Sequence, residues 1–186
     1  MKTTLIAFLL LFSSTLFAQN EVYFSDEKPQ TISMQGLAAS FQGSIIPDNS
    51  AGYALSLNYF YELRVMSKVT ALFSGGFTGN FNYTDLQIEA EPRYYFSLTE
   101  RTSAKRGGLN SGWFISLPLN ISSPLISEYA SFADYFNYKA TLNIGYRYPL
   151  TNKWFLEGKA GGGLMRNGGN EDLTIYNATL KVAYTF

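Results

Sequence analysis

The segment 53–65 constrains the fold of this chain more than any other stretch. Its alternate positions are apolar, namely Tyr53, Leu55, Leu57, Tyr59, Tyr61, Leu63 and Val65. The positions between them include Ser56, Asn58, Glu62 and Arg64. Successive side chains of a β-strand point to opposite faces, so the pattern predicts one long strand with an apolar and a polar face. Such a strand exceeds the usual length in globular sheets, and it can cross a bilayer at a tilt, which takes about 9–11 residues.

The same alternation recurs along the chain. It predicts eight strands over residues 31–41, 53–65, 69–78, 83–98, 111–121, 136–148, 154–165 and 172–186, with loops at 43–52, 99–110 and 122–135. Neighbouring strands joined by short turns run antiparallel. Eight such strands close most readily into a barrel, because closure removes exposed edges. We therefore predict an all-β fold, an eight-stranded antiparallel up-and-down β-barrel.

The first residues have a different character from the rest. Lys2, the apolar run 5–12 and the sequence Leu16-Phe17-Ala18 before Gln19 predict a secretory signal peptide over residues 1–18. Residues 19–30 are polar and predict a short tail, so the barrel occupies residues 31–186. The chain has no cysteine, so it does not rely on disulfides. After the signal peptide no apolar run of about 18 residues remains, which excludes membrane helices.

Alternation alone does not decide which face points inward. A soluble, lipocalin-like barrel puts its apolar face inside and binds an apolar ligand there, whereas a membrane barrel turns that face to lipid. The export signal and the position of the aromatic residues favour a transmembrane barrel. With an even number of strands both termini lie at one end, and the aromatic residues are expected to gather at that one end, as an interfacial girdle. Its predicted members are Tyr59, Tyr61, Tyr94, Phe96, Trp113, Tyr146, Tyr148, Trp154, Tyr184 and Phe186.

In a membrane barrel the polar face becomes the lumen. It carries Glu62, Arg64, Asp85, Glu89, Glu91, Arg93, Lys139, Arg147, Glu157, Lys159 and Lys181. Charges removed from water are costly unless they are paired, so this nearly balanced set predicts a layer of salt bridges. An eight-stranded barrel is just wide enough for its own side chains, which argues against an open pore. A narrow pore or a transporter of small or apolar solutes stays as an alternative, and we expect Gly161 and Gly163 to leave room for a long neighbouring side chain.

The residue types argue against an enzyme. The chain has no histidine, which excludes histidine-based triads, bases and metal sites. Glu89 and Glu91, with Asp85 on the same face, can bind a cation or act as acid and base, but we favour their pairing with Arg93 and Arg64. Gly158 and the run 161–163 lack the Lys-Ser/Thr of a phosphate-binding loop. We therefore predict no catalytic residue, no metal and no cofactor.

Two loops carry further candidate contacts. Arg101, Lys105 and Arg106 can touch phosphates, although a solvated turn explains them more simply. The loop 122–135 should face outside, and it carries apolar residues that folding alone does not need, namely Leu125, Ile126, Tyr129, Phe132 and Tyr135. This loop either contacts an extracellular partner or folds over the barrel mouth. Formal net charge is zero, so the chain has no basic footprint for nucleic acid.

Several short motifs resemble known proteins. The segment 91–96 (Glu-Pro-Arg-Tyr-Tyr-Phe), followed by Arg101 and by Gly112-Trp113-Phe114, is similar to small outer-membrane barrels of Bacteroidota. Gly145-Tyr146-Arg147-Tyr148 and Trp154-Phe155-Leu156-Glu157 fit the same family. The expected architecture resembles the OmpA-type transmembrane domain. Most such proteins have no known activity, so the resemblance implies fold and location more than function.

The end of the chain carries a second resemblance. Val182, Tyr184 and Phe186 lie in phase and resemble the C-terminal signature of bacterial outer-membrane barrels, which the barrel-assembly machinery reads. This likeness implies the bacterial outer membrane, with both termini periplasmic. The implied partners are outer-membrane lipid, lipopolysaccharide and the assembly machinery.

Overall fold

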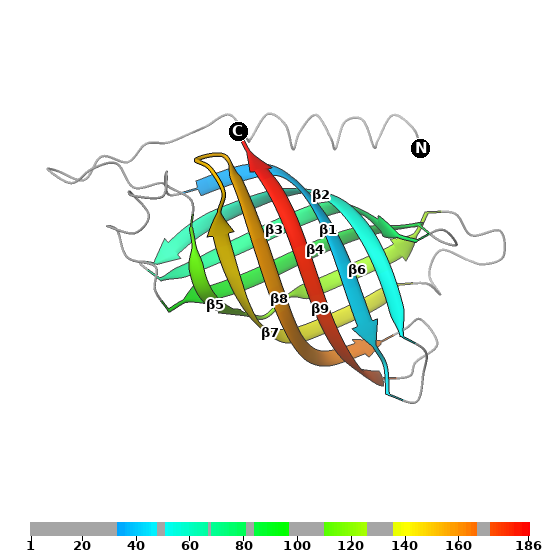
Figure 1. Ribbon diagram of the computed structural model, residues 1–186. Coiled ribbons are helices and arrows are strands. Elements are labelled where there is room, and N and C mark those ends of the chain that lie inside the picture. Colours follow the sequence, from blue (N-terminus) through cyan, green and yellow to red (C-terminus); the bar gives the residue numbers. More distant parts are fainter. Residues whose placement is uncertain are drawn as a thin grey trace, which may run out of the picture.

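A computed structural model describes residues 33–47, 51–66, 68–80, 84–96, 110–125, 136–166 and 172–186. Within these ranges the chain forms one antiparallel sheet (Figure 1). Its strands are β1 (Ser33–Ile45), β2 (Gly52–Met66), β3 (Val69–Gly79), β4 (Thr84–Tyr95), β5 (Gly112–Ser116), β6 (Leu119–Pro124), β7 (Asn137–Pro149), β8 (Trp154–Arg166) and β9 (Asp172–Thr185). None of the described residues forms a helix long and apolar enough to cross a membrane.

The sheet closes on itself. β1 to β4 pair in sequence, as do β7 to β9, and β1 pairs with β9 from Gly36 opposite Thr185 to Ile45 opposite Tyr176. β5 and β6 both pair with β4 on one side and with β7 on the other, so they are two parts of one barrel strand. The predicted eight-stranded antiparallel up-and-down barrel is therefore confirmed.

The strand predicted over residues 111–121 is interrupted at Leu117 and Pro118 and resumes as β6. Proline has no N–H for the ladder, which is why it disturbs a strand interior. The register nevertheless continues, since the Leu117 amide donates to the Pro92 carbonyl at 3.1 Å and the Thr141 amide donates to the Pro118 carbonyl at 3.2 Å. Two predicted loops begin too early, because β1 continues to Ile45 and β6 to Pro124.

The strands are staggered around the barrel. Cross-strand neighbours followed from Ser33 lead back to β1 at Ile45, which is 12 residues further along the strand. The intermediate neighbours are Leu63, Ala71, Pro92, Leu117, Leu142, Gly162 and Tyr176. A closed sheet needs such a stagger together with a strand tilt, typically about 35–45°. Figure 1 shows the oblique course of the strands.

Two glycines of β8 allow the sheet to coil. A Cβ on Gly161 would meet the Leu142 carbonyl of β7, and a Cβ on Gly163 would meet the Ala140 carbonyl. Glycine is needed where backbones approach this closely. Main chain of β7 fills the space beside Gly163, and the Asn143 side chain shares the space beside Gly161, so only Gly161 leaves room for a neighbouring side chain, and that side chain is a short one.

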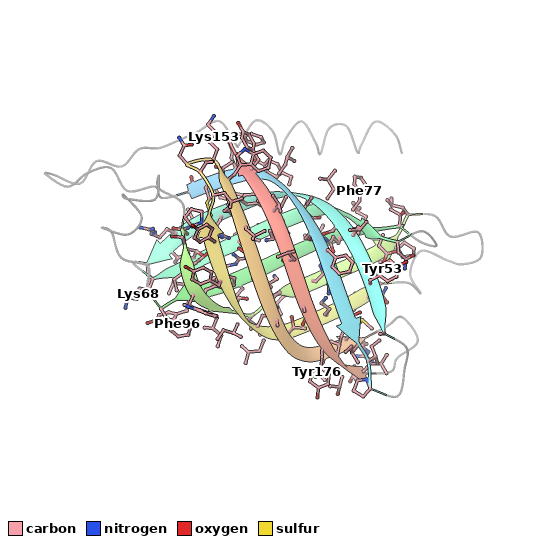
Figure 2. All side chains as sticks on the ribbon, viewed as in Figure 1. Tyr53, Lys68, Phe77, Phe96, Lys153 and Tyr176 are labelled. Carbon is pink, nitrogen blue, oxygen red and sulfur yellow. The ribbon has the colours of Figure 1, made fainter. Side chains whose placement is uncertain are left out.

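The outside of the barrel is apolar and the inside is polar (Figure 2). Ile88 is 65% exposed and Leu55 is 60% exposed, whereas Arg93 is 1% exposed and Arg147 is wholly buried. Folded proteins in water show the opposite distribution. The lipocalin-like alternative needs the apolar face inside, and the structure puts that face outside.

Aromatic side chains lie near both ends of the barrel. At the end marked by Lys68, Phe96 and Lys153 (Figure 2), ring pairs include Trp113 with Tyr146 at 5.2 Å and Trp154 with Tyr184 at 5.0 Å. Tyr94, Phe96, Tyr148 and Phe186 lie near that end as well. The other end carries Phe41, Tyr53, Phe77, Tyr138 and Tyr176. The prediction that the aromatic residues gather at one end only is therefore wrong.

Two predicted members of the girdle, Tyr59 and Tyr61, lie further from the rim than expected. Tyr59 is midway along β2, and its hydroxyl donates to the Gln35 Oε1 at 2.7 Å. Tyr61 lies opposite Gln35 and Phe73. Both belong to the outward face, but the placement of Tyr59 near the strand end was wrong, because Tyr59 lies at the middle of β2 rather than near Met66.

Candidate functional site

One face of each of the strands β2, β4, β7, β8 and β9 points into the lumen, and a set of ionised side chains lies on that face. We call this set the lumen charge cluster; it consists of Glu62, Glu91, Arg93, Arg147, Glu157, Lys159 and Lys181. Every member is at most 8% exposed. The cluster gathers charges from five strands, so it forms only when the barrel closes.

Glu157 is the centre of the cluster. Its carboxylate accepts from both terminal nitrogens of Arg93, at 2.8 and 3.0 Å, and from Nε of Arg147 at 2.8 Å. The Nη2 atom of Arg147 lies 2.7 Å away, and Nζ of Lys181 lies 3.2 Å away. This one carboxylate therefore balances part of the positive charge of Arg93, Arg147 and Lys181. Pairs between guanidinium and carboxylate groups are among the stronger hydrogen bonds in proteins.

The other two buried carboxylates extend the network in opposite directions. Glu91 contacts Arg93 at 2.6 Å and Lys159 at 3.0 Å. Glu62 contacts Arg147 at 2.7 Å, and it accepts from the Thr70 hydroxyl at 2.8 Å. The Asn110 amide and the Tyr95 hydroxyl also donate to Glu62, at 3.2 and 3.3 Å. Each carboxylate is held by at least two donors and is therefore poorly suited to act as a base.

Inward aromatic rings cover the two arginines. The guanidinium carbon of Arg93 lies 4.7 Å from the Phe114 ring centre, and that of Arg147 lies 4.2 Å from the Phe155 ring centre. Phe60 meets Phe155 edge to face at 5.8 Å. Cations over aromatic faces are attracted by the ring quadrupole, most strongly where water is excluded.

Sequence reasoning missed these inward rings, although a signal exists. Phe60, Tyr95 and Phe155 each lie two residues from a member of the cluster and therefore share its face. The predicted girdle contains none of these rings, because most aromatic residues of the chain belong to the apolar phase. Thr70 and Asn110, which hold Glu62, were missed as well.

The remaining predicted charges lie at the edges of the cluster. Glu89 is 3.8 Å from Lys159, and it shares a cross-strand row with Asn120 and Lys139. Arg64 donates to the Asn110 side chain at 2.8 Å. Asp85 lies on the lumen face near the start of β4, at the end of the barrel away from the chain termini. Across the described ranges no group of three acidic side chains is arranged to hold a metal ion.

The half of the lumen away from the termini is lined differently. The hydroxyls of Ser40 and Ser56 lie 2.5 Å apart, and the Asn58 amide reaches Ser56 at 3.4 Å. The Gln87 amide donates to Asn58 at 3.0 Å, and the Asn120 amide donates to Gln87 at 3.3 Å. We call these five residues the outer polar chain. They are neutral and only partly buried.

Several candidate residues lie outside the described residues. They include Arg101, Lys105, Arg106, Ile126, Tyr129, Phe132, Tyr135 and all of segment 1–32. Of the predicted contact loop, Leu125 follows β6 and is 49% exposed.

No family model matches the chain, and no curated protein matches it. Among solved structures, Neisserial surface protein A is similar with a TM-score of 0.48 and 13% identity, over 86% of this chain and 100% of that one. Ail, the attachment invasion locus protein of Yersinia pestis, gives a TM-score of 0.44 and 8% identity over 83% and 97% of the two chains. A de novo designed transmembrane β-barrel gives 0.41 and 12% over 86% and 98%. At these values the likeness concerns the arrangement of strands alone.

Proposed function

We propose that this chain is an integral outer-membrane protein that crosses the bilayer as a closed barrel, with both termini in the periplasm. One observation carries this proposal: large apolar side chains surround the outside, while ionised side chains fill the inside. In water such an arrangement would expose a wide apolar surface, which monomeric soluble proteins rarely do. In a bilayer the same surface meets hydrocarbon, and the backbone groups are satisfied within the closed sheet.

The dimensions support the same proposal. The long strands contain between 11 and 15 residues. At about 3.3 Å per residue and a tilt of about 45°, they rise by roughly 25–35 Å, close to the ~30 Å hydrocarbon core of a bilayer. Aromatic side chains near both ends suit the two interfaces of a membrane.

The proposed partners follow from this location. Outer-membrane lipid and lipopolysaccharide would surround the apolar wall, and the barrel-assembly machinery would read the last strand. Val182 on that strand and Phe186 directly after it are exposed, at 40% and 58%, and Tyr184 lies in phase between them. An extracellular partner would meet the loop that follows Leu125.

We assign a non-enzymatic role, either structural or in surface contact, to a barrel plugged by the lumen charge cluster. The carboxylates of the cluster are engaged by arginine, lysine and neutral donors, so none is placed as a free nucleophile or base. Two bulky arginines and the rings beside them occupy the termini-side lumen. The barrel would thus act as a rigid support that displays its outer loops.

The outer polar chain favours one alternative, a narrow pore. A lumen lined by hydroxyl and amide groups admits water and small polar solutes down to the lumen charge cluster. Conductance in planar bilayers separates the two proposals. The plugged barrel should give no channel steps, whereas an Arg93→Gly variant, which removes one plugging side chain, should give small steps. Steps of equal size from both proteins would favour the pore.

Membrane fractionation followed by a gel of unheated and boiled samples tests the proposed location. We expect the protein in the outer-membrane fraction, with a mobility shift on boiling, because a closed barrel resists detergent. Recovery in the soluble fraction without detergent would contradict the proposal.

A further inference from the structure

A groove of about 420 Å³ crosses the outward wall of the barrel over β4, β6, β7 and β8. Two rows of outward side chains border the groove. The row nearer the middle of the barrel consists of the cross-strand neighbours Ala90, Leu119, Ala140 and Leu164. The other row consists of Ile88, Ile121, Tyr138 and Arg166. We call it the wall groove.

The groove owes its depth to small residues between large ones. Ala90 and Ala140 alternate with Leu119 and Leu164 along the first row, and Ile88 and Leu164 project at 65% and 59% exposure. The two rows lie two residues apart along the strands, or about 6.6 Å. A helix with side chains is about 10–12 Å across and is too wide for the gap between these rows, whereas the apolar gap beside the alanines suits a single extended hydrocarbon chain.

The groove changes from apolar to charged along its length. On β4 it begins near mid-strand at Ile88 and Ala90, and on β8 it ends at Arg166, the last residue of that strand. The Nε atom of Arg166 lies 3.9 Å from a carboxylate oxygen of Asp172, and these side chains are 55% and 69% exposed. From β4 to β8 the groove spans three strand spacings, roughly 14 Å. An apolar slot with a guanidinium at its outer end suits an amphiphile with an anionic head.

We propose that the wall groove binds one acyl chain of lipopolysaccharide, with a lipid A phosphate against Arg166. The inference rests on the proposed membrane location, since only lipid or another membrane protein reaches this face there. With periplasmic termini, the β8–β9 end lies in the outer leaflet, which lipopolysaccharide occupies. Arginine presents several donors in a planar fork that matches phosphate geometry.

The test uses the full barrel extracted from membranes into detergent, stripped of lipid and titrated with purified bisphosphorylated lipid A under native mass spectrometry. Ala140→Leu fills the groove and should weaken binding about tenfold or more, because an added side chain in a fitted slot clashes. Arg166→Gln should weaken it about fivefold, the upper range for an exposed ion pair. Asp172→Asn should strengthen it, because it removes a negative charge beside the phosphate.

Ala160→Leu is the matched control, since Ala160 also faces outward on β8 but lies outside the groove. Lys153→Gln, at the opposite end of the barrel, controls for charge. The proposal is overturned if Ala160→Leu weakens binding as much as Ala140→Leu, or if both groove variants bind normally. It is also overturned if phosphatidylglycerol binds as tightly, or if the stripped protein dimerises through this face. Absence of the gel shift on boiling would instead count against the barrel location itself.

Discussion

The two halves of the lumen accommodate polar side chains inside the barrel in different ways. On the termini side, Arg93, Arg147 and Glu157 are almost wholly buried and carry full charges, which are neutralised by one another and covered by rings. On the far side, the outer polar chain carries no charge and remains partly buried, and the charges Asp85, Glu89 and Lys139 on that side are not joined in a network like that of Glu157. Hydroxyl and amide groups tolerate partial contact with water, whereas a buried charge needs its partner in place.

This difference indicates in which half of the lumen a substitution should lower the free energy of unfolding most. A neutral hydrogen bond contributes about 1 kcal/mol, because water replaces it when it is lost. Removing one member of a buried ion network leaves its partners charged and dry, which costs about 3–5 kcal/mol. The termini-side half should therefore respond to substitution much more strongly than the outer half.

The largest effect is expected from Glu157→Ala. The substitution leaves Arg93, Arg147 and Lys181 without their shared carboxylate. We expect a loss of about 4 kcal/mol in the free energy of unfolding, within the range for broken buried pairs. Urea unfolding in detergent micelles, followed by the gel shift on boiling, measures this loss. Gln87→Ala in the outer polar chain is the control, and equal losses in the two variants would contradict the contrast between the halves.

Phe155→Ala should cost about 3 kcal/mol, the lower range for deleting a buried aromatic ring. The ring covers Arg147 and packs against Phe60, so both contacts disappear. The same urea titration applies. Phe77→Ala, which removes an outward ring at the other end, should cost much less, because lipid or detergent fills the space.

A double-mutant cycle between Glu62 and Arg147 sharpens the comparison. These side chains meet at 2.7 Å in the buried network. Glu62→Gln and Arg147→Met, combined, should show a coupling energy of about 2 kcal/mol, as close buried charge pairs do. The corresponding cycle of Asn58→Ala and Gln87→Ala should give less than about 0.5 kcal/mol. Additive losses at Glu62 and Arg147 would show that the network is less coupled than its geometry indicates.

The smallest effect is expected from Asn58→Ala alone. It removes the amide contacts to Ser56 and Gln87, at 3.4 and 3.0 Å. We expect a loss of about 1 kcal/mol, because water in the outer half replaces these bonds. A loss as large as that of Glu157→Ala would mean that water is excluded from this half as well.

Much of the fold could be predicted from alternation, since a period of two is a local property of each strand. Strands 53–65 and 69–78 were predicted within one residue at each end. The interruption at Leu117 and Pro118 was missed, because Pro118 falls in phase with the alternation on either side. Phe60 and Phe155 were missed although they share the alternation phase of Glu62 and Glu157, because most aromatic residues of this chain belong to the apolar phase.

The sequence by itself determined which side chains share a face, because neighbouring residues of a strand point in opposite directions whatever the strand packs against. It also determined that a balanced set of charges occupies one of those faces. Only the tertiary structure decided which charges meet. Arg93 and Glu157 are 64 residues apart, and they touch because closure and stagger bring β4 and β8 to the same level of the lumen. The direction in which the sheet curves on closure decided which face became the outside. In this barrel the apolar face is the outer one.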